Sequence, residues 1–190
     1  MKKVVLFVVV NFSLTLFCQE GLNLDYLASK YTLSSIEEFK KLLSIPNDAN
    51  DKIGIEKNIE WTEKEFGNRG FKVSKIITMG APLLLAKRDF TSKGKTVLIY
   101  LQMDGQPVDP SKWNQENPYS PVLKKKNSSG NWETINWNKI YEYNDDWRIF
   151  ARSSSDAKGP VSMFLAAIDA IDDNGITPNF NIKVILDFEE

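Results

Sequence analysis

The 190-residue sequence contains no histidine and a single cysteine, Cys18. Without histidine, the chain cannot build a Ser-His-Asp or Cys-His catalytic triad from its own residues, nor a zinc site based on imidazole. A lone cysteine also excludes a disulfide within the chain. Any metal ion held by these residues would depend on oxygen ligands, which in general favour Mg²⁺, Ca²⁺ or Mn²⁺ over Zn²⁺.

The sequence also lacks an excess of charge of either sign, with a formal net charge of −1. Nucleic-acid-binding domains usually carry a basic stripe or patch, so the balance of charge argues against a nucleic-acid partner. The one tight basic run is Lys124-Lys125-Lys126, which lies in a polar stretch. We expect this run to be a solvent-exposed loop.

The first residues have the pattern of a secretory signal. Lys2 and Lys3 precede a short apolar stretch over residues 4–17, too short and too early for a stable membrane span. We therefore expect residues 1–19 to be a signal peptide and the protein to be exported, either periplasmic or secreted. Lipidation of Cys18, which would make a lipoprotein, is the alternative. No second membrane segment follows in the sequence.

The remaining sequence alternates helical and strand patterns. Ser35-Ile36-Glu37-Glu38 has the form of a capping box, which predicts a helix that begins at Ser35 and ends before Pro46. Further helices are expected over 52–68 and 159–173, and residues 105–146 are expected to be irregular. The expected strands are 71–78, 82–87, 95–101, 147–151 and 182–188. This alternation predicts an α/β domain with a mixed sheet.

Three polar clusters lie where ligand sites gather in α/β proteins, at the carboxyl ends of strands and before helices. They span residues 100–107, 152–160 and 186–190. Each cluster alone has a plain structural explanation, as a turn, a helix cap or a solvated strand end. Together they bring several carboxylates to one region, and carboxylates placed close together repel unless a cation lies among them.

The order of these clusters resembles the M20 metallopeptidases, in particular their carnosinase-like dipeptidase branch. That family reads His-x-Asp-x-Gln-Pro, then Arg-Gly-x-x-Asp-x-Lys-Gly, then a Glu-Glu pair followed by Gly-Ser. The matching residues here are Asp104-Gly105-Gln106-Pro107-Val108-Asp109, Trp113, Pro118-Tyr119-Ser120-Pro121, Arg152, Asp156, Lys158, Gly159 and the pair Glu189-Glu190. The resemblance covers about residues 33–190.

The resemblance implies a fold and a domain. Residues 20–190 would be the N-terminal portion of an M20-type catalytic domain, a three-layer α/β/α structure with a mixed central sheet. The smaller domain that the family uses for dimerisation and for closing over substrate would be absent from this chain. We therefore expect the chain to be truncated and inactive alone, and a full-length protein could be a homodimer.

The resemblance also implies roles for individual residues. Asp156 would bridge two metal ions, usually Zn²⁺, with Mn²⁺ or Co²⁺ as alternatives. Asp104 would orient the ligand two positions before it, at Gln102. Glu189 and Glu190 would supply a general base and a metal ligand. Either Glu190 is the base, or Glu189 is the base and Glu190 the ligand. The substrate would be a peptide or an N-acyl amino acid.

Two departures from the family pattern bear on activity. Gln102 stands where the family has a metal-binding histidine, and a neutral amide oxygen is a weaker ligand than imidazole, so we expect the second metal to be held loosely. Ser153 replaces the glycine that usually follows the arginine.

The first hypothesis is a metal-dependent hydrolase of dipeptides or N-acyl amino acids in full-length form. The alternative is a catalytically dead relative that acts as an exported binding protein.

A third interpretation concerns the aromatic residues of the long polar segment. They are Trp113, Trp132, Trp137 and Trp147. Such residues could form a carbohydrate-binding or structural surface, but aromatic side chains more often cover the edge of a core.

Overall fold

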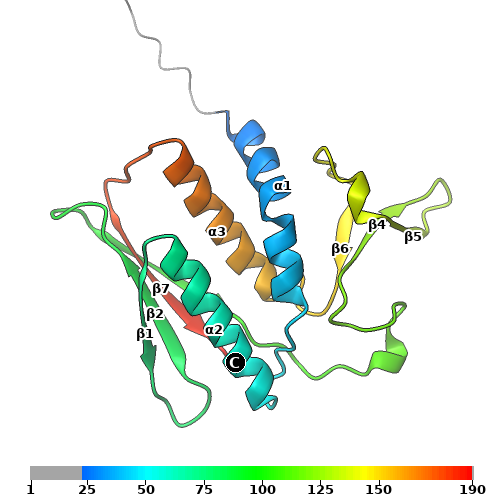
Figure 1. The fold of residues 1–190 in the computed structure, drawn as a ribbon, viewed down its shortest axis with the longest axis horizontal. Helices are drawn as coiled ribbons and strands as arrows, with labels where there is room; N and C mark the ends of the chain where they lie inside the picture. The colour runs from blue at the N-terminus through cyan, green and yellow to red at the C-terminus, as the bar shows by residue number, and fades with distance from the viewer. Residues whose placement is uncertain (1–22, 190) are drawn as a thin grey trace, which may run out of the picture.

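The computed structural model describes residues 23–189, so the predicted signal peptide, Cys18 and Glu190 lie outside the described range. Its main body is a layer of helices on a four-stranded sheet (Figure 1). The helices are α1 (Leu24–Leu43), α2 (Lys52–Asn68) and α3 (Lys158–Asp173). The strands are β1 (Lys72–Ile76), β2 (Leu83–Arg88), β3 (Thr96–Gln102) and β7 (Asn181–Asp187). None of the described helices combines the length and apolarity that a membrane crossing needs.

Helices α2 and α3 and the four strands lie close to their predicted bounds, but the predicted start of the first helix is wrong. Helix α1 begins at Leu24, where the side chain of Asn23 accepts a hydrogen bond from Tyr26 N at 3.0 Å. Ser35 lies inside this helix, and its hydroxyl donates to Thr32 O at 3.0 Å instead of capping a new helix. Helix α1 packs on α3, and in the part of α1 before Ser35 the hydroxyl of Tyr31 donates a hydrogen bond to Asp173 Oδ2 of α3 at 3.0 Å.

The strand order in the main sheet is β1-β2-β7-β3. Strand β2 runs antiparallel to both of its neighbours, β1 and β7, whereas β3 is parallel to β7. This arrangement confirms the predicted mixed α/β fold with a mixed sheet. Parallel strands require a long crossover connection. Here the crossover is the segment 103–180, which leaves the sheet at the end of β3 and rejoins it at the start of β7.

Helices α2 and α3 pack on one face of this sheet, and α1 packs on α3 in the same helical layer. Alternate residues of β7, namely Ile182, Val184 and Leu186, are buried against them. The helices contribute further buried residues to this core: Leu42, Ile55, Ile59, Phe66, Val161, Leu165 and Ile168. Full burial of such a side chain contributes about 1.5–3 kcal/mol each, so this layer carries most of the hydrophobic stabilisation.

The opposite face of the sheet is not covered by any described element. Leu98 and Tyr100 of β3 are 61% and 54% exposed, although Ile99 and Leu101, which alternate with them, pack against the core. Of the expected three layers, residues 23–189 thus form one helical layer and the sheet.

A second, three-stranded sheet of order β5-β4-β6 lies beside α1, away from the main sheet (Figure 1). Its strands are β4 (Val122–Lys126), β5 (Trp132–Ile135) and β6 (Arg148–Phe150), with short 3₁₀ helices η1 (Pro110–Lys112) and η2 (Trp137–Lys139) before and between them. The prediction that residues 105–146 are irregular is therefore wrong for the β4–β5 hairpin.

The predicted solvent-exposed loop at Lys124-Lys125-Lys126 is also wrong. These residues form part of β4, where Lys124 is buried and its ammonium lies 4.7 Å from the centre of the Phe150 ring. Lys125 pairs with Glu133 on the neighbouring strand at 3.3 Å. An aromatic ring on β6 and a carboxylate on β5 thus interact with lysines of this run, which allows a basic sequence to form a strand.

A network of ion pairs around Arg69 ties the three helices together. The guanidinium contacts Asp169 of α3 at 2.7 Å, Glu38 of α1 at 3.1 Å and Glu65 of α2 at 3.4 Å. Burial opposes the charge of Arg69, but its hydrogen bonds with Asp169 and Glu38 outweigh this effect and raise its pKa. Arg69 therefore stays charged and fixes the spacing of the helix layer.

We predict that Arg69→Ala lowers the free energy of unfolding by about 2–4 kcal/mol, because it leaves three carboxylates without their shared cation. Chemical denaturation checks this value. Lys64→Ala is the control, since Lys64 also pairs with Glu65 but is 72% exposed, and it should change stability by less than about 0.5 kcal/mol. Equal effects of the two substitutions would contradict a structural role for the Arg69 network.

Candidate functional site

The parallel pair β3–β7 brings the first and third polar clusters to one edge of the sheet. Gln102 lies opposite Asp187 in the register, and Met103 N donates to Asp187 O at 2.7 Å just beyond it. Asp104 and Glu189 follow directly after these two strand ends. The prediction that the two clusters share an edge is therefore correct, and carboxyl ends of strands are the usual position of sites in α/β sheets.

The second cluster contacts the first through Gly105. A Cβ atom at Gly105 would lie 2.7 Å from Ser153 Oγ and 3.1 Å from Arg152 Nε. Only glycine allows this close approach, so Gly105 serves a packing function between the clusters, and the Asp-Gly dipeptide after β3 does not form a turn. Arg152 is anchored in turn by its backbone N–H, which donates to Pro118 O at 2.7 Å.

Ser153 occupies a backbone conformation that favours glycine. Its φ angle is +62°, the only positive value for a non-glycine residue in the described part of the chain. This conformation gives a physical reason for the glycine at the matching position of the M20 motif. Ser153 is buried, and its hydroxyl is hydrogen-bonded to the side chain of Asn47 at 3.0 and 3.2 Å.

Asp156 is exposed in the turn that leads into α3, and the peptide bond that follows it is cis. Two residues later, Lys158 is fully buried and donates hydrogen bonds to Leu42 O at 2.9 Å and Ile45 O at 2.5 Å. Burial lowers the pKa of Lys158 to about 7. Lys158 thus anchors the Asp156 turn to the end of α1, a structural role for the lysine of the motif.

Glu189 is exposed and turns toward the β1–β2 connection. Its Oε2 accepts a hydrogen bond from Ala81 N at 2.5 Å, and its own N–H donates to Asp187 Oδ1 at 3.1 Å. The carboxylate borders a pocket of about 480 Å³ between this connection and the start of α2. The pocket is also lined by Asn50, Lys52, Glu56 and Met79. Glu190, the other half of the predicted pair, lies outside the described residues.

Gln102 and Asp187 lie on the sheet face that the helices leave open. Gln102 is half-buried, and Asp187 Oδ2 accepts a hydrogen bond from the Tyr100 hydroxyl at 2.8 Å. Asp187 was not among the predicted site residues. The alternation of the strand could have identified it, because Ile182, Val184 and Leu186 face the core and Asp187 must then face away from it.

The described residues do not complete a metal site by themselves. Between residues 23 and 189, no three His, Cys, Asp or Glu side chains form a group that could hold a metal ion. Asp104 is buried at the strand end, Asp156 is exposed on its turn and Glu189 is bonded to Ala81. The structure brings together the segments that carry the predicted ligands, but not a complete set of ligand side chains.

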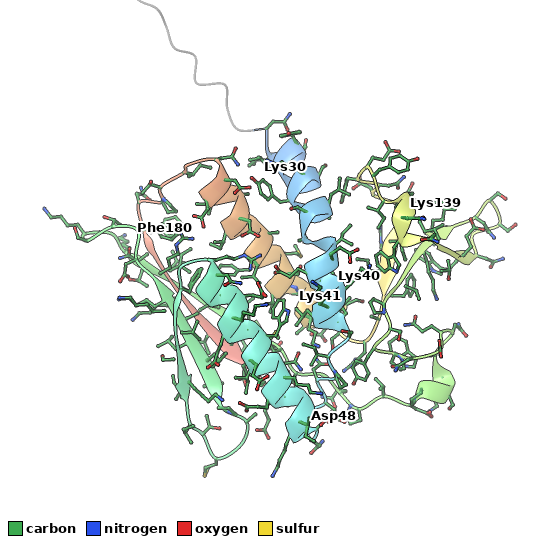
Figure 2. The ribbon with its side chains drawn as sticks, in the orientation of Figure 1. Lys30, Lys40, Lys41, Asp48, Lys139 and Phe180 are labelled. Atoms are coloured by element: carbon green, nitrogen blue, oxygen red, sulfur yellow. The ribbon has the colours of Figure 1, made fainter. Side chains whose placement is uncertain are left out.

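Two of the four tryptophans of the long polar segment, Trp132 of β5 and Trp137 of η2, contact other side chains of the protein. Trp132 packs edge-on against Phe150 with ring centres 5.0 Å apart. The Trp137 ring lies 4.6 Å from the Lys40 ammonium, on the side of α1 that faces the small sheet (Figure 2). These contacts favour the packing interpretation of the aromatic residues over a carbohydrate-binding surface.

Solved structures of M20 peptidases have the same fold as this chain. The dipeptidase Dug1p of Saccharomyces cerevisiae matches with a TM-score of 0.66 and 17% identity, over 85% of this chain and 33% of its own. The M20 family metallo-carboxypeptidase Sso-CP2 of Sulfolobus solfataricus matches with a TM-score of 0.63 and 27% identity, over 82% and 31%. Human carnosine dipeptidase 1 matches with a TM-score of 0.66 and 18% identity, over 88% and 35%.

These matches confirm the M20 resemblance at the level of the fold. The chain spans about one third of the length of each of the three proteins. No protein-family model and no curated protein sequence matches the chain.

We predict that Lys158→Met lowers the free energy of unfolding by about 1–3 kcal/mol, because two buried carbonyl groups at the end of α1 lose their donor. Urea denaturation measures this loss. Lys41→Met is the control, since Lys41 lies exposed on the same helix end, and its stability should stay within about 0.5 kcal/mol of the parent. A Lys158→Met variant as stable as the parent would refute the anchoring role.

Proposed function

We propose that the full-length protein is a metal-dependent hydrolase that cleaves a peptide or amide bond in a dipeptide or an N-acyl amino acid. The observation that carries the proposal is the meeting of the three motif segments at one sheet edge, within a fold shared with M20 peptidases. The names of the matching proteins describe peptidases and dipeptidases.

The proposed roles follow the chemistry of the side chains at this edge. Asp156 is exposed on its turn and is free of steric cover, as a bridging metal ligand must be. Asp104 is buried directly after β3, a position suited to orienting a neighbouring ligand at Gln102. Glu189 and Glu190 would share the roles of general base and ligand.

The bound metal would be a divalent ion, Zn²⁺ or alternatively Mn²⁺ or Co²⁺, which polarises the scissile carbonyl when present. Residues 23–189 do not supply a full ligand set, so the proposal requires donors outside the described residues. The amide of Gln102 is a weak ligand, and we expect the occupancy of a second metal to be low.

A catalytically inactive binding protein is the second candidate function, and Gln102 is the residue that favours it. Such a protein would bind peptides without hydrolysing them. The exported location that the leader predicts is compatible with both functions, and lipidation at Cys18 would tether either form to a membrane.

We predict that Asp156→Asn in the full-length protein lowers kcat/KM for dipeptide hydrolysis by more than about 100-fold, beyond the loss typical of outer-shell residues. Asp146→Asn is the control, since Asp146 is exposed in the loop before β6 and should keep the parental rate. A parent protein that binds dipeptides but never hydrolyses them, with or without added Zn²⁺, would favour the binding function.

We also predict that Gln102→His increases the zinc content of the full-length protein, because imidazole binds Zn²⁺ better than an amide oxygen does. Metal analysis after dialysis against limiting Zn²⁺ measures the stoichiometry. We expect it to rise toward two ions per chain, the number held in a two-metal site. An unchanged stoichiometry would show that Gln102 does not lie in the metal site.

A further inference from the structure

The connection between α1 and α2 contacts both motif segments through one side chain. Asn47 is fully buried, at 0% exposure, and a buried amide needs partners. Its Nδ2 donates to Met103 O at 2.8 Å and to Ser153 Oγ at 3.0 Å. One amide therefore bridges the segment that ends β3 and the turn that leads into α3.

The backbone of the same connection reinforces this bridge. Gly105 N donates to Asn47 O at 2.7 Å, and Asp48 forms an isolated parallel bridge with Gly105. Figure 2 shows Asp48 beside the first turn of α2, where the α1–α2 connection ends. The residues on both sides of Asp104 are thus hydrogen-bonded to residue 47, through Met103 O and Gly105 N.

The turn that carries Asp156 is attached to the same connection at two points. Ser153 is bound to Asn47, and the Lys158 ammonium is bound to the carbonyl groups of Leu42 and Ile45. Ser153 and Lys158 are themselves joined, since Lys158 N donates to Ser153 O at 3.1 Å. A displacement of residue 47 would therefore move the two motif segments relative to each other.

We propose that Asn47 is a positioning residue that fixes the Asp104 segment against the Asp156 turn. It acts on the two segments through its hydrogen bonds with Met103, Gly105 and Ser153. The proposal rests on the proposed function only in treating Asp104 and Asp156 as parts of one site. The link between the two segments can be measured without metal and without substrate.

The α1–α2 connection provides a matched control residue. Asn58 is also fully buried, and its Nδ2 donates to Pro46 O and Gly54 O at 2.7 Å each. It therefore holds the same connection from α2 but contacts neither motif segment. Substitution of either asparagine leaves buried carbonyl groups without a donor, so both should lower stability by a similar amount.

Hydrogen exchange of individual amides tests the positioning role. In the full-length protein, Asn47→Ala should speed exchange at Gly105 and Lys158 by on the order of tenfold or more, because the bonds that fix both segments are lost. Asn58→Ala should leave exchange at these two amides within about twofold of the parent, although it lowers the midpoint of thermal unfolding similarly. Parental exchange in Asn47→Ala, or equal acceleration in both variants, would overturn the proposal.

Ser153→Gly provides a second variant in case Asn47→Ala does not fold. Glycine tolerates the positive φ angle, so this variant should fold, but it lacks the hydroxyl that binds Asn47. We expect faster exchange at Lys158, again by on the order of tenfold. Unchanged exchange in Ser153→Gly would overturn the proposal on its own.

Dipeptide hydrolysis separates this proposal from the proposed function. If the parent hydrolyses dipeptides, Asn47→Ala should lower kcat by about 10–100-fold with KM nearly unchanged, whereas Asn58→Ala should keep the parental kcat. A rise in KM alone would overturn the positioning role. If the parent has no activity, the proposed function fails, and hydrogen exchange alone still decides whether Asn47 positions the two segments.

Discussion

The parallel pairing of β3 with β7 is the constraint on which the rest of the structure depends. It aligns Gln102 with Asp187, so that the strand ends carrying Asp104 and Glu189 meet at one edge. Parallel strands cannot be joined by a tight turn, and the crossover between these two contains the small sheet, the Asp156 turn and α3. The crossover therefore delivers the second polar cluster, residues 152–160, to the edge that the pairing defines, and residues far apart in sequence become neighbours.

The helix layer fixes that crossover in place. The ion pairs of Arg69 hold α3 against α1 and α2, and Lys158 attaches the start of α3 to the end of α1. Arg69 is a buried cation shared by three carboxylates, an arrangement that is costly to bury unpaired but geometrically specific, and Lys158 donates buried hydrogen bonds to two backbone carbonyl groups. The position of the Asp156 turn thus depends on polar contacts as well as on the hydrophobic core beneath them.

Sequence reasoning was reliable where the local pattern and the tertiary structure agree. The apolar alternation of residues 182–188 and the periodicity of 159–173 gave β7 and α3 almost to the residue. It failed at α1, where a plausible capping box at Ser35 lies inside a helix that packing on α3 extends to Leu24. It failed again at Lys124, because the Phe150 ring beside its ammonium belongs to β6, a strand that pairs with β4 but lies far from it in the sequence. The motif segments could be predicted as neighbours, but the orientation of Glu189 toward Ala81 depends on a contact between residues more than a hundred positions apart.

The pair Asn47–Ser153 illustrates why part of a site escapes a motif. A serine at a φ angle of +62° is strained relative to glycine, by an amount on the order of 1 kcal/mol. Its hydroxyl gains hydrogen bonds with a buried amide, each worth about 0.5–1.5 kcal/mol, which offsets this strain. The substitution of the motif glycine is therefore tolerable here because Asn47, more than a hundred positions earlier, supplies the partner. By the motif alone, Ser153 is a mismatch to the family pattern. In the structure, its hydrogen bonds with Asn47 connect the two segments of the candidate site.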